Sequence, residues 1–365
     1  MKQIVETILK DFSVKDFQKD LIQWYLEEKR DLPWRKDKDP YKVWVSEVML
    51  QQTRVDTVIP YFNRFMEKYP TLESLAAAEE QELLKIWEGL GYYSRIRNLH
   101  QAVREVQEKY DGVVPKTRKE LEQLKGVGSY TAGAVLSIAY DQPEPAVDGN
   151  VMRVLSRILN IEDDIAKTKT KKMFENIVSE IISREDPSSF NQGLMELGAL
   201  ICTPRSPSCL LCPVREHCRA FALGKTEELP VKKTKKSYKT VKLLAVVLQD
   251  KHGKFILRQR PEEGLLANLW EFPNEPVMRG PKNQLTYLEE VLQEKHGFTS
   301  RIKQPLCSIS HQFSHLKWEI DAFVGEIEGE IEESATLKAV SKEEIASQYP
   351  LPVPHQKIWE KYNEQ

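Results

Sequence analysis

Apolar residues between Asp16 and Phe221 recur at steps of three and four, which is the spacing that one face of an α-helix buries. The stretches Tyr41–Val48 and Val151–Ile158 show this spacing clearly. No stretch in this region alternates apolar and polar residues over the length that a sheet requires. We therefore predict a mainly helical N-terminal domain.

Two pairs of residues mark where helices begin in this domain. Asp39-Pro40 precedes one apolar stretch and Asp148-Gly149 precedes another. An aspartate at such a position accepts hydrogen bonds from the first free N–H groups, and proline already has the backbone angle of the first helical residue. Both pairs predict helix starts.

The pattern changes after Gly224. The stretch Val231–Lys242 holds six lysines and no acid, which is typical of a linker. Beyond it, 241–249 and 254–260 read as two strands with a turn, 284–298 as an amphipathic helix, and 315–327 as a further strand. We expect three parts: a helical domain at 1–224, a Lys-rich linker at 225–238, and an α+β domain at 239–365.

Composition limits what the chain does. Its 365 residues carry 53 Lys and Arg against 55 Asp and Glu, a net charge of -2, so it is not a globally basic nucleic-acid binder, although local basic sites remain open. Its apolar runs are too short to span a membrane, and its first residues lack the features of a secretion signal. We expect a cytoplasmic protein.

Four of the five cysteines lie together, spaced C-x6-C-x2-C-x5-C at positions 202, 209, 212 and 218. In a reducing compartment such thiols favour a shared metal over disulfides, and ligand type alone leaves zinc and [4Fe-4S] open. The spacing resembles the iron-sulfur loop of the endonuclease III-like DNA glycosylases. That resemblance implies a [4Fe-4S] cluster held by Cys202, Cys209, Cys212 and Cys218.

A Gly-x-Gly turn at Gly126 and Gly128 opens a helix that continues to Tyr140. Glycines let backbone N–H groups face an anion, and the natural ligand here is a DNA phosphate bound without reading sequence. A plain tight turn is the simpler alternative. The turn followed by Asp148 resembles the helix-hairpin-helix glycosylases, in which an aspartate follows the hairpin; a cation bound at the hairpin is a further expectation.

Two carboxyl groups carry the predicted chemistry. Asp148 at a helix start should have a lowered pKa, and its anion would stabilise the oxocarbenium-like sugar left when an N-glycosidic bond breaks. Glu47 lies among Val43, Trp44 and Leu50 at helical spacing, so we expect partial desolvation, a raised pKa and a role as general acid. The alternatives are that Asp148 is only a helix cap and that Glu47 is an exposed glutamate at the edge of the apolar face.

Several motifs together resemble the MutY-type adenine DNA glycosylases: DLPWR at 31–35, SEVMLQQT at 46–53, WEGLGYYSRIRNL at 87–99, GVGSYT at 126–131 and VDGNV at 147–151. The resemblance implies that Glu47 protonates N7 of adenine. The other implied roles are support of Asp148 and the water by Tyr130 and Asn150, an adenine pocket of Trp34, Arg35 and Gln192, and contacts to DNA by Leu50, Gln52 and Tyr92, with Gln52 and Tyr92 filling the stack.

One hairpin residue separates two kinds of glycosylase. Bifunctional relatives have a lysine that forms an imine with the sugar where this chain has Tyr130, and a phenol forms no imine. We predict a monofunctional enzyme, with Lys125 an unpromising substitute. The alternatives are a bifunctional lyase for oxidised pyrimidines and a binding module without chemistry.

The C-terminal domain resembles the Nudix fold, most clearly in Glu263–Glu275. Its helix lacks most of the metal-binding pattern of a working Nudix hydrolase. Val291 and Lys295 replace two glutamates and only Glu294 remains, so we expect no pyrophosphate hydrolysis. In MutY-type enzymes this domain checks for 8-oxoguanine, and the implied recognition loop consists of Phe313, Ser314 and His315.

The sequence thus predicts a base-excision enzyme that removes adenine opposite 8-oxoguanine or guanine in double-stranded DNA. We expect a monomer that is nucleoid-associated when bound to DNA, with no membrane partner. The linker is a candidate contact for repair or replication proteins.

Overall fold

A computed structural model of the chain describes residues 2–233, 238–277 and 283–365. The chain divides into two compact units. The helical unit consists of Met1–Ala77 and Asn98–Thr234, and the sheet unit of Ala78–Arg97 and Lys235–Gln365. The short segment Ala78–Arg97 thus groups with the C-terminal part of the chain, which no feature of the sequence indicated. Part of the expected linker, 234–237, lies outside the described residues.

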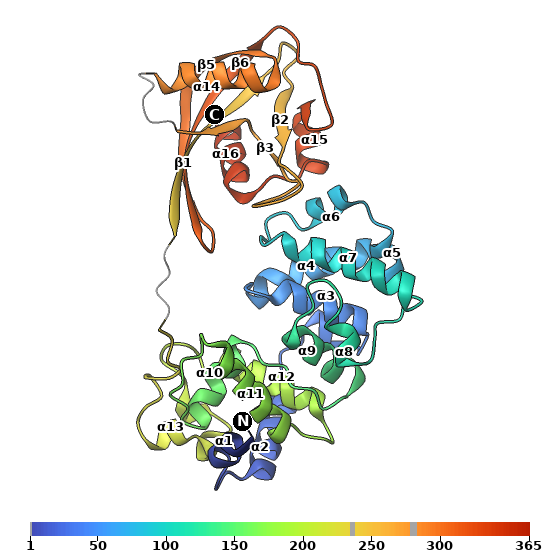
Figure 1. The fold of residues 1–365 in the computed structure, drawn as a ribbon, viewed down its shortest axis with the longest axis vertical. Helices are drawn as coiled ribbons and strands as arrows, with labels where there is room; N and C mark the ends of the chain where they lie inside the picture. The colour runs from blue at the N-terminus through green and yellow to red at the C-terminus, as the bar shows by residue number, and fades with distance from the viewer. Residues whose placement is uncertain (1, 234–237, 278–282) are drawn as a thin grey trace. The chain divides into compact units, whose positions relative to one another are not determined.

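The helical unit confirms the predicted mainly helical domain (Figure 1). Its α-helices are α1 (Lys2–Ile8), α2 (Val14–Glu28), α3 (Pro40–Leu50), α4 (Val55–Lys68), α5 (Leu72–Ala76), α8 (Arg118–Leu121), α9 (Ser129–Tyr140), α10 (Gly149–Ile158), α11 (Thr168–Ile181), α12 (Pro187–Leu200) and α13 (Arg219–Ala222). Its 3-10 turns are η1 (Pro33–Arg35), η2 (Cys209–Leu211) and η3 (Arg215–His217). Helix α7 (Ser94–Lys109) begins in the sheet unit and ends in the helical unit.

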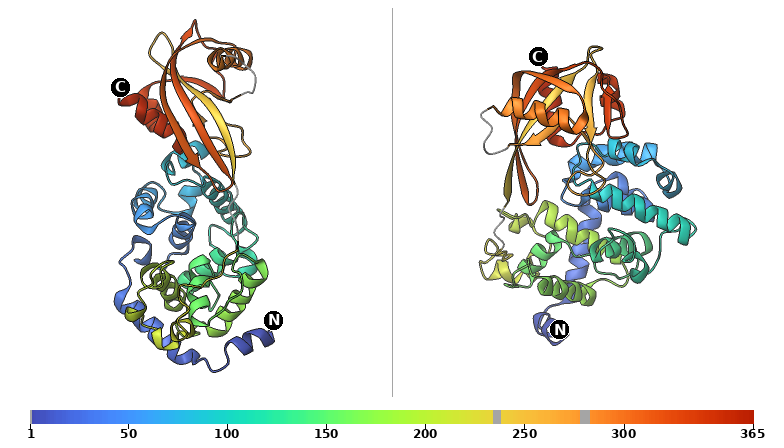
Figure 2. Two further views of the ribbon diagram at one scale, coloured as in Figure 1. Left: turned by 90° about the vertical axis from the view of Figure 1, so that its left-hand side faces the viewer. Right: turned by 45° about the horizontal axis from the view of Figure 1, so that its top comes forward.

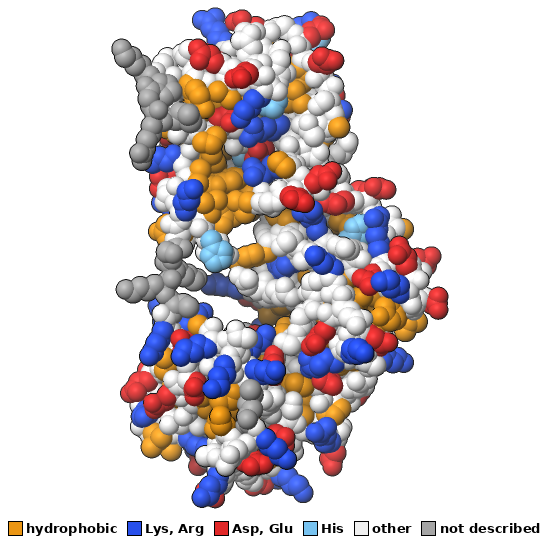
Figure 3. Space-filling model, in the orientation of Figure 1, with side chains coloured by type: hydrophobic (Ala, Val, Ile, Leu, Met, Phe, Trp, Pro, Cys, Tyr) orange, Lys and Arg blue, Asp and Glu red, His pale blue; other side chains and the backbone are white. Residues whose placement is uncertain are grey.

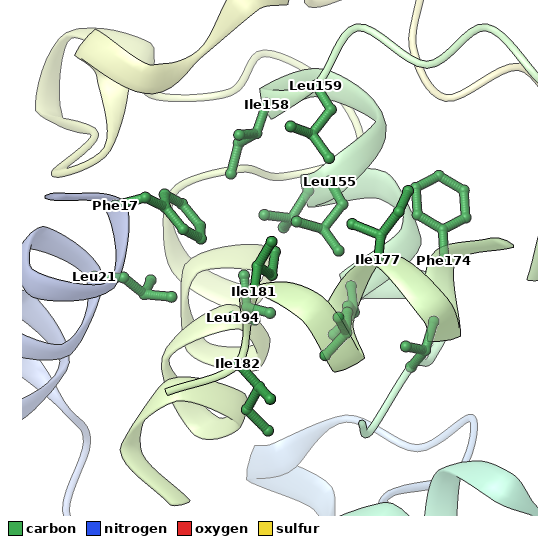
Figure 4. Close-up of a cluster of buried hydrophobic side chains, with 14 of the residues drawn as sticks. Phe17, Leu21, Leu155, Ile158, Leu159, Phe174, Ile177, Ile181, Ile182 and Leu194 are labelled. Atoms are coloured by element: carbon green, nitrogen blue, oxygen red, sulfur yellow. The ribbon is translucent and has the colours of Figure 1, made fainter. Parts of the chain in front are cut away.

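A core of aliphatic and aromatic side chains holds α2, α10, α11 and α12 together (Figure 4). Phe174, Ile177 and Ile181 of α11 point into it at helical spacing, and Leu155 of α10 meets them there. Each such side chain contributes about 1.5–3 kcal/mol through its removal from water. Val214, from the cysteine-bearing loop, is buried in the same core, so the loop is attached to the body of the unit.

The sheet unit is built on a seven-stranded sheet, with strand order β3-β2-β1-β6-β5, β4 beside β1 and β7 beside β2. Its strands are β1 (Lys239–Gln249), β2 (Phe255–Gln259), β3 (Trp270–Glu271), β4 (Asn274–Pro276), β5 (Thr299–Gln312), β6 (Leu316–Glu328) and β7 (Leu337–Val340). Its helices are α6 (Glu80–Ile86), α14 (Gln284–His296), α15 (Lys342–Ser347) and α16 (Val353–Asn363). The parallel pair β1–β6 and the antiparallel pair β5–β6 are the longest ladders.

Helices cover both faces of this sheet (Figure 2). Odd-numbered residues of Leu243–Leu248 pack in one core with Ile345 and Ile358 of α15 and α16. Even-numbered residues pack in a second core with Leu288 and Leu292 of α14. Because both faces are buried, the strand is apolar throughout, which explains the uninterrupted apolar run in the sequence. The predicted α+β architecture is confirmed.

Within the described ranges, none of the helices is both long and apolar enough to cross a bilayer.

Candidate active site

Helix α3 carries Glu47 into the interior of the helical unit. Asp39 begins the helix as predicted, because its Oδ1 accepts a 2.8 Å hydrogen bond from the Tyr41 N–H, and Pro40 follows at the first helical position. Residues Val43–Met49 are all buried, and Glu47 is only 5% exposed. The predicted desolvation of this carboxyl is confirmed.

Burial raises the pKa of Glu47 to about 7. The phenol of Tyr130 donates a 2.6 Å hydrogen bond to Glu47 Oε2 and lowers the pKa, as does the charge of Arg35, while the charge of Asp148 raises it. A carboxyl balanced in this way holds a proton near neutral pH, and such a group can act as a general acid.

Asp148 is the N-cap of α10, as predicted. Its Oδ1 accepts from the Val151 N–H at 2.8 Å and its Oδ2 from the Asn150 amide at 2.9 Å. The prediction that its pKa is lowered is wrong. Burial raises the pKa, and this effect exceeds the opposing effects of the two hydrogen bonds and of Arg153. Both carboxyls of the site therefore have raised pKa values.

The loop that leads to Asp148 is fixed against α9. A Cβ on Gly133 would come within 1.9 Å of the Pro145 carbonyl oxygen, so only glycine permits this approach. Arg118 donates to the carbonyl oxygens of Pro145 and Ser129, both at 3.0 Å. The hairpin helix and the loop that leads to Asp148 are thus joined by close packing and by the hydrogen bonds of Arg118.

The predicted hairpin is present between α8 and α9. Gly126 has a φ of +77°, and a Cβ there would lie 2.7 Å from Asn98 Cβ. Gly128 caps α9, and both glycines are exposed, as a phosphate-binding turn requires. The expected cation at this turn stays a prediction.

Nine of the predicted site residues line one cleft of about 780 Å³ that opens to solvent. They are Trp34, Arg35, Glu47, Leu50, Gln52, Tyr130, Asp148, Asn150 and Gln192. The two carboxyl groups therefore face the same space. The hydrogen bond of Tyr130 goes to Glu47, whereas Asn150 contacts Asp148 as the resemblance implies. Tyr92 and the loop Phe313–His315 belong to the sheet unit.

Sequence reasoning missed Glu196, which also lines the cleft. It is 1% exposed and accepts hydrogen bonds from Arg30 and Arg35, including two at 2.9 Å to its Oε2. Burial alone would raise its pKa, but the two guanidinium groups hold the pKa at about 2. Its position one helical turn after Gln192 in α12 is the signal that would have found it.

A chain of polar contacts joins Asp148 to the cysteine-bearing loop. Arg153 donates to Asn150 Oδ1 at 3.0 Å and to the Cys202 carbonyl oxygen at 2.9 Å. It also donates to the Gly198 carbonyl oxygen at 2.9 Å. The side chain that orients Asp148 is therefore held by a guanidinium that contacts the first cysteine.

The four clustered cysteines line one small pocket of about 20 Å³. Burial, together with the charges of the neighbouring thiols, raises the pKa of the Cys212 thiol to about 12. Arg157, 1% exposed, donates to Cys202 Sγ at 3.3 Å and to the Thr203 carbonyl oxygen at 2.7 Å. Crowded buried thiols beside an arginine require a shared cation to ionise.

Four thiols that line one pocket are the ligand set that a [4Fe-4S] cluster takes. A [4Fe-4S] cluster is wider than one ion and suits four thiolates spread around a pocket. When bound, it supplies a clamp for the loop.

The predicted recognition loop forms the turn between β5 and β6. Ser314 and His315 are exposed, while the Phe313 ring lies 5.1 Å from that of Trp318 and anchors the turn. On α14, Lys295 pairs with the buried Glu275 at 2.7 Å. A fixed ammonium group at this position is consistent with the expected lack of a magnesium site.

Family models match three parts of the chain. Residues 45–181 match the HhH-GPD superfamily base excision DNA repair proteins, 202–218 the iron-sulfur binding domain of endonuclease III, and 244–361 the NUDIX domain. A thermostable thymine-DNA glycosylase of solved structure is 28% identical, with a TM-score of 0.52 over 57% of this chain and 97% of its own. Fold and site define a helix-hairpin-helix DNA glycosylase with a C-terminal NUDIX domain.

Two relatives place the chain more closely. The adenine DNA glycosylase of Rattus norvegicus is 38% identical over 379 residues, which cover 89% of this chain and 73% of that protein. The adenine DNA glycosylase of Buchnera aphidicola subsp. Schizaphis graminum is 35% identical over 301 residues, covering 82% and 84%. The chain belongs to the adenine DNA glycosylase family, and its cysteine loop holds a [4Fe-4S] cluster.

Proposed function

We propose that the chain removes adenine paired with 8-oxoguanine, or with guanine, from double-stranded DNA by hydrolysis of the N-glycosidic bond. The observation that carries this proposal is that Glu47 and Asp148 line one cleft, with Tyr130 bonded to Glu47. The adenine DNA glycosylases among the relatives support adenine as the base.

In this proposal the protonated Glu47 donates to N7 of the extruded adenine. The bond between the sugar C1′ and N9 then breaks, and its electron pair leaves with a neutral base. Asp148, in its ionised form, stabilises the positive sugar until water adds to C1′ and passes a proton to the Glu47 carboxylate, which restores the acid. The hydrogen bonds from Val151 and Asn150 favour that ionised form.

The enzyme is monofunctional in this account. Tyr130 occupies the position of the imine-forming lysine, and Lys125 is exposed and is not among the residues that line the cleft. A hydrolytic route that uses water needs no amine nucleophile.

Recognition of the mispair involves groups from both units. Gln52 and Tyr92 fill the stack opposite the extruded base, and Gly126 and Gly128 bind a phosphate. Ser314 hydrogen-bonds the edge of 8-oxoguanine and His315 holds a neighbouring phosphate. Lys and Arg are interspersed with Asp and Glu on the face shown in Figure 3.

Two further expectations complete the proposal. The enzyme acts in the cytoplasm as a monomer and is associated with the nucleoid while bound to DNA. The linker residues, of which 234–237 lie outside the described part, contact repair or replication proteins.

The direct test is chromatography of free bases after incubation with duplexes containing A:8-oxoguanine, A:G, A:T and thymine glycol:A. The proposal expects adenine from the first two duplexes and little from the third. Release of the oxidised pyrimidine, together with a borohydride-trapped adduct lost in Lys125→Ala, would support a bifunctional lyase instead. Binding without any released base would overturn an enzymatic role.

A further inference from the structure

Segment Ala78–Arg97 lies inside the stretch that matches the glycosylase superfamily, yet it packs with the sheet unit. The segment consists of α6, a loop that carries Tyr92, and the start of α7. A residue proposed to fill the DNA stack is therefore carried by the unit proposed to recognise the opposite base.

Helix α6 is attached to the sheet unit through hydrogen bonds of defined direction. The Gln81 amide nitrogen donates to the Asn268 carbonyl oxygen at 3.1 Å, and its oxygen accepts from the Trp270 indole at 3.1 Å. The Asn268 amide in turn donates to Glu80 at 2.7 Å. Because donor and acceptor are both used, only one orientation of the Gln81 amide fits.

The loop that follows is attached by charged groups. Glu88 Oε1 accepts a 2.6 Å hydrogen bond from the Leu351 N–H, and its Oε2 pairs with Lys85 at 2.6 Å. The Lys85 ammonium also donates to the carbonyl oxygens of Ile345 at 2.9 Å and Tyr349 at 3.3 Å. Charge-assisted bonds of this kind are among the stronger ones in proteins.

The loop that follows these attachments presents Tyr92 outward. Tyr92 has a φ of +48° and is 45% exposed. The Gly91 carbonyl oxygen accepts from the Trp87 indole at 3.1 Å and from Arg95 at 3.0 Å. The Arg95 guanidinium lies 5.4 Å from the centres of both the Trp87 and Tyr92 rings. A left-handed tyrosine persists only where its surroundings fix it.

The attachment point and the recognition turn share one core. Leu351 is 2% exposed and belongs to the hydrophobic core that also contains Trp318, against which Phe313 packs. The Phe313–His315 turn and the attachment of the Tyr92 loop at Leu351 thus contact the same packed core. A movement of the turn can therefore reach the loop through these side chains.

We propose that the sheet unit positions Tyr92 for insertion into the DNA stack, with Glu88 as the positioning residue. The inference rests on the proposed function and adds a means by which recognition of the opposite base controls extrusion of adenine. Glu88 acts through the loop and touches neither the base nor the sugar.

A double-mutant cycle on the full chain tests this. Single-turnover excision from A:8-oxoguanine duplex is measured for wild type, Glu88→Ala, Tyr92→Ala and the double variant. If Glu88 acts through Tyr92, Glu88→Ala slows excision about 10-fold or more, and the double variant is no slower than Tyr92→Ala alone. Glu88→Gln, which still accepts from the Leu351 N–H, recovers part of the rate, and the exposed Glu79→Ala behaves as wild type.

A second readout needs no excision. 2-Aminopurine placed beside 8-oxoguanine brightens when its stack opens, so wild type should raise its fluorescence, while Tyr92→Ala and Glu88→Ala should not. If the rate loss of the double variant equals the product of the two single losses, or if Glu88→Ala brightens the probe as fully as wild type, the positioning role of Glu88 is wrong. The proposed function would still stand. A wild type that brightens the probe but releases no adenine would overturn the proposed function instead.

Discussion

The Tyr130 hydroxyl donates a 2.6 Å hydrogen bond to Glu47 Oε2, and the two side chains come from different helices, α9 and α3. The bond occupies one carboxyl oxygen and leaves the other for a base in the cleft. It also favours the ionised carboxylate, so it opposes the rise in pKa that burial causes. Tyr130 thereby adjusts how readily Glu47 gives up its proton.

Tyr130→Phe should shift the pH dependence of excision. Because a hydrogen bond that lowers the Glu47 pKa is lost, that pKa rises above its value of about 7. Excision requires protonated Glu47, so the alkaline limb of the single-turnover pH profile moves to higher pH, by about half a unit to one unit. An unchanged or lowered alkaline limb would show that the bond does not control the acid.

Glu47→Gln should stabilise the protein at alkaline pH while abolishing excision. The folded-state pKa of Glu47, about 7, exceeds its ordinary 4.5, so the folded state binds the extra proton. That contribution to stability is full below pH 4.5 and is lost as pH rises through 7. The variant should gain about 2–3 kcal/mol over wild type at pH 8 and little at pH 5, as measured by denaturant unfolding. A constant difference across pH would contradict the buried, protonated state.

Glu196→Gln should destabilise the helical unit. Glu196 is held ionised by Arg30 and Arg35, and removal of its charge leaves two guanidinium groups beside the cleft without a counter-ion. Breaking such a pair costs about 3 kcal/mol in the free energy of unfolding. The surface pair of Glu105 with Lys109 provides the control, since Glu105→Gln should have little effect. Equal losses of unfolding free energy in Glu196→Gln and Glu105→Gln would show that the buried pairs of Glu196 contribute no more to stability than a surface pair.

Arg157→Met should reduce the iron bound per chain. The guanidinium contacts Cys202 Sγ and holds the Thr203 and Leu229 carbonyl oxygens, so its loss frees the start of the cysteine loop and the segment that follows α13. Iron analysis and visible absorption of freshly purified protein measure the effect. The exposed Arg205→Met serves as control and should keep its cluster. Full iron in Arg157→Met would mean that the cysteines alone fix the loop.

Local pattern predicted the helix start at Asp148 and the apolar neighbours of Glu47, because both depend on spacing within a few residues. The resemblance to the MutY-type glycosylases, and not spacing, implied that Glu47 is the acid and gave the other residues of the cleft their roles. The sign of the Asp148 pKa shift depended on burial by distant segments, which no local pattern reveals. Glu196 was missed because Arg35, one of its partners, is 161 residues away in the chain.

The division into units shows the same limit. Helical periodicity assigned α6 to the first domain, and the helix itself was correctly expected. Its membership of the sheet unit depends on bonds such as that of Gln81 to Trp270, which join residues far apart in the sequence. Periodicity predicts which residues form an element, and long-range side-chain contacts decide which body the element joins.

The central claim is that an anion at position 148 makes adenine leave the sugar. Single-turnover excision by Asp148→Asn, under conditions where the duplex with A:8-oxoguanine is fully bound, tests it most directly. The account predicts a loss of about a thousandfold or more in rate, with duplex affinity and iron content preserved. Excision by the variant at close to the wild-type rate would contradict it.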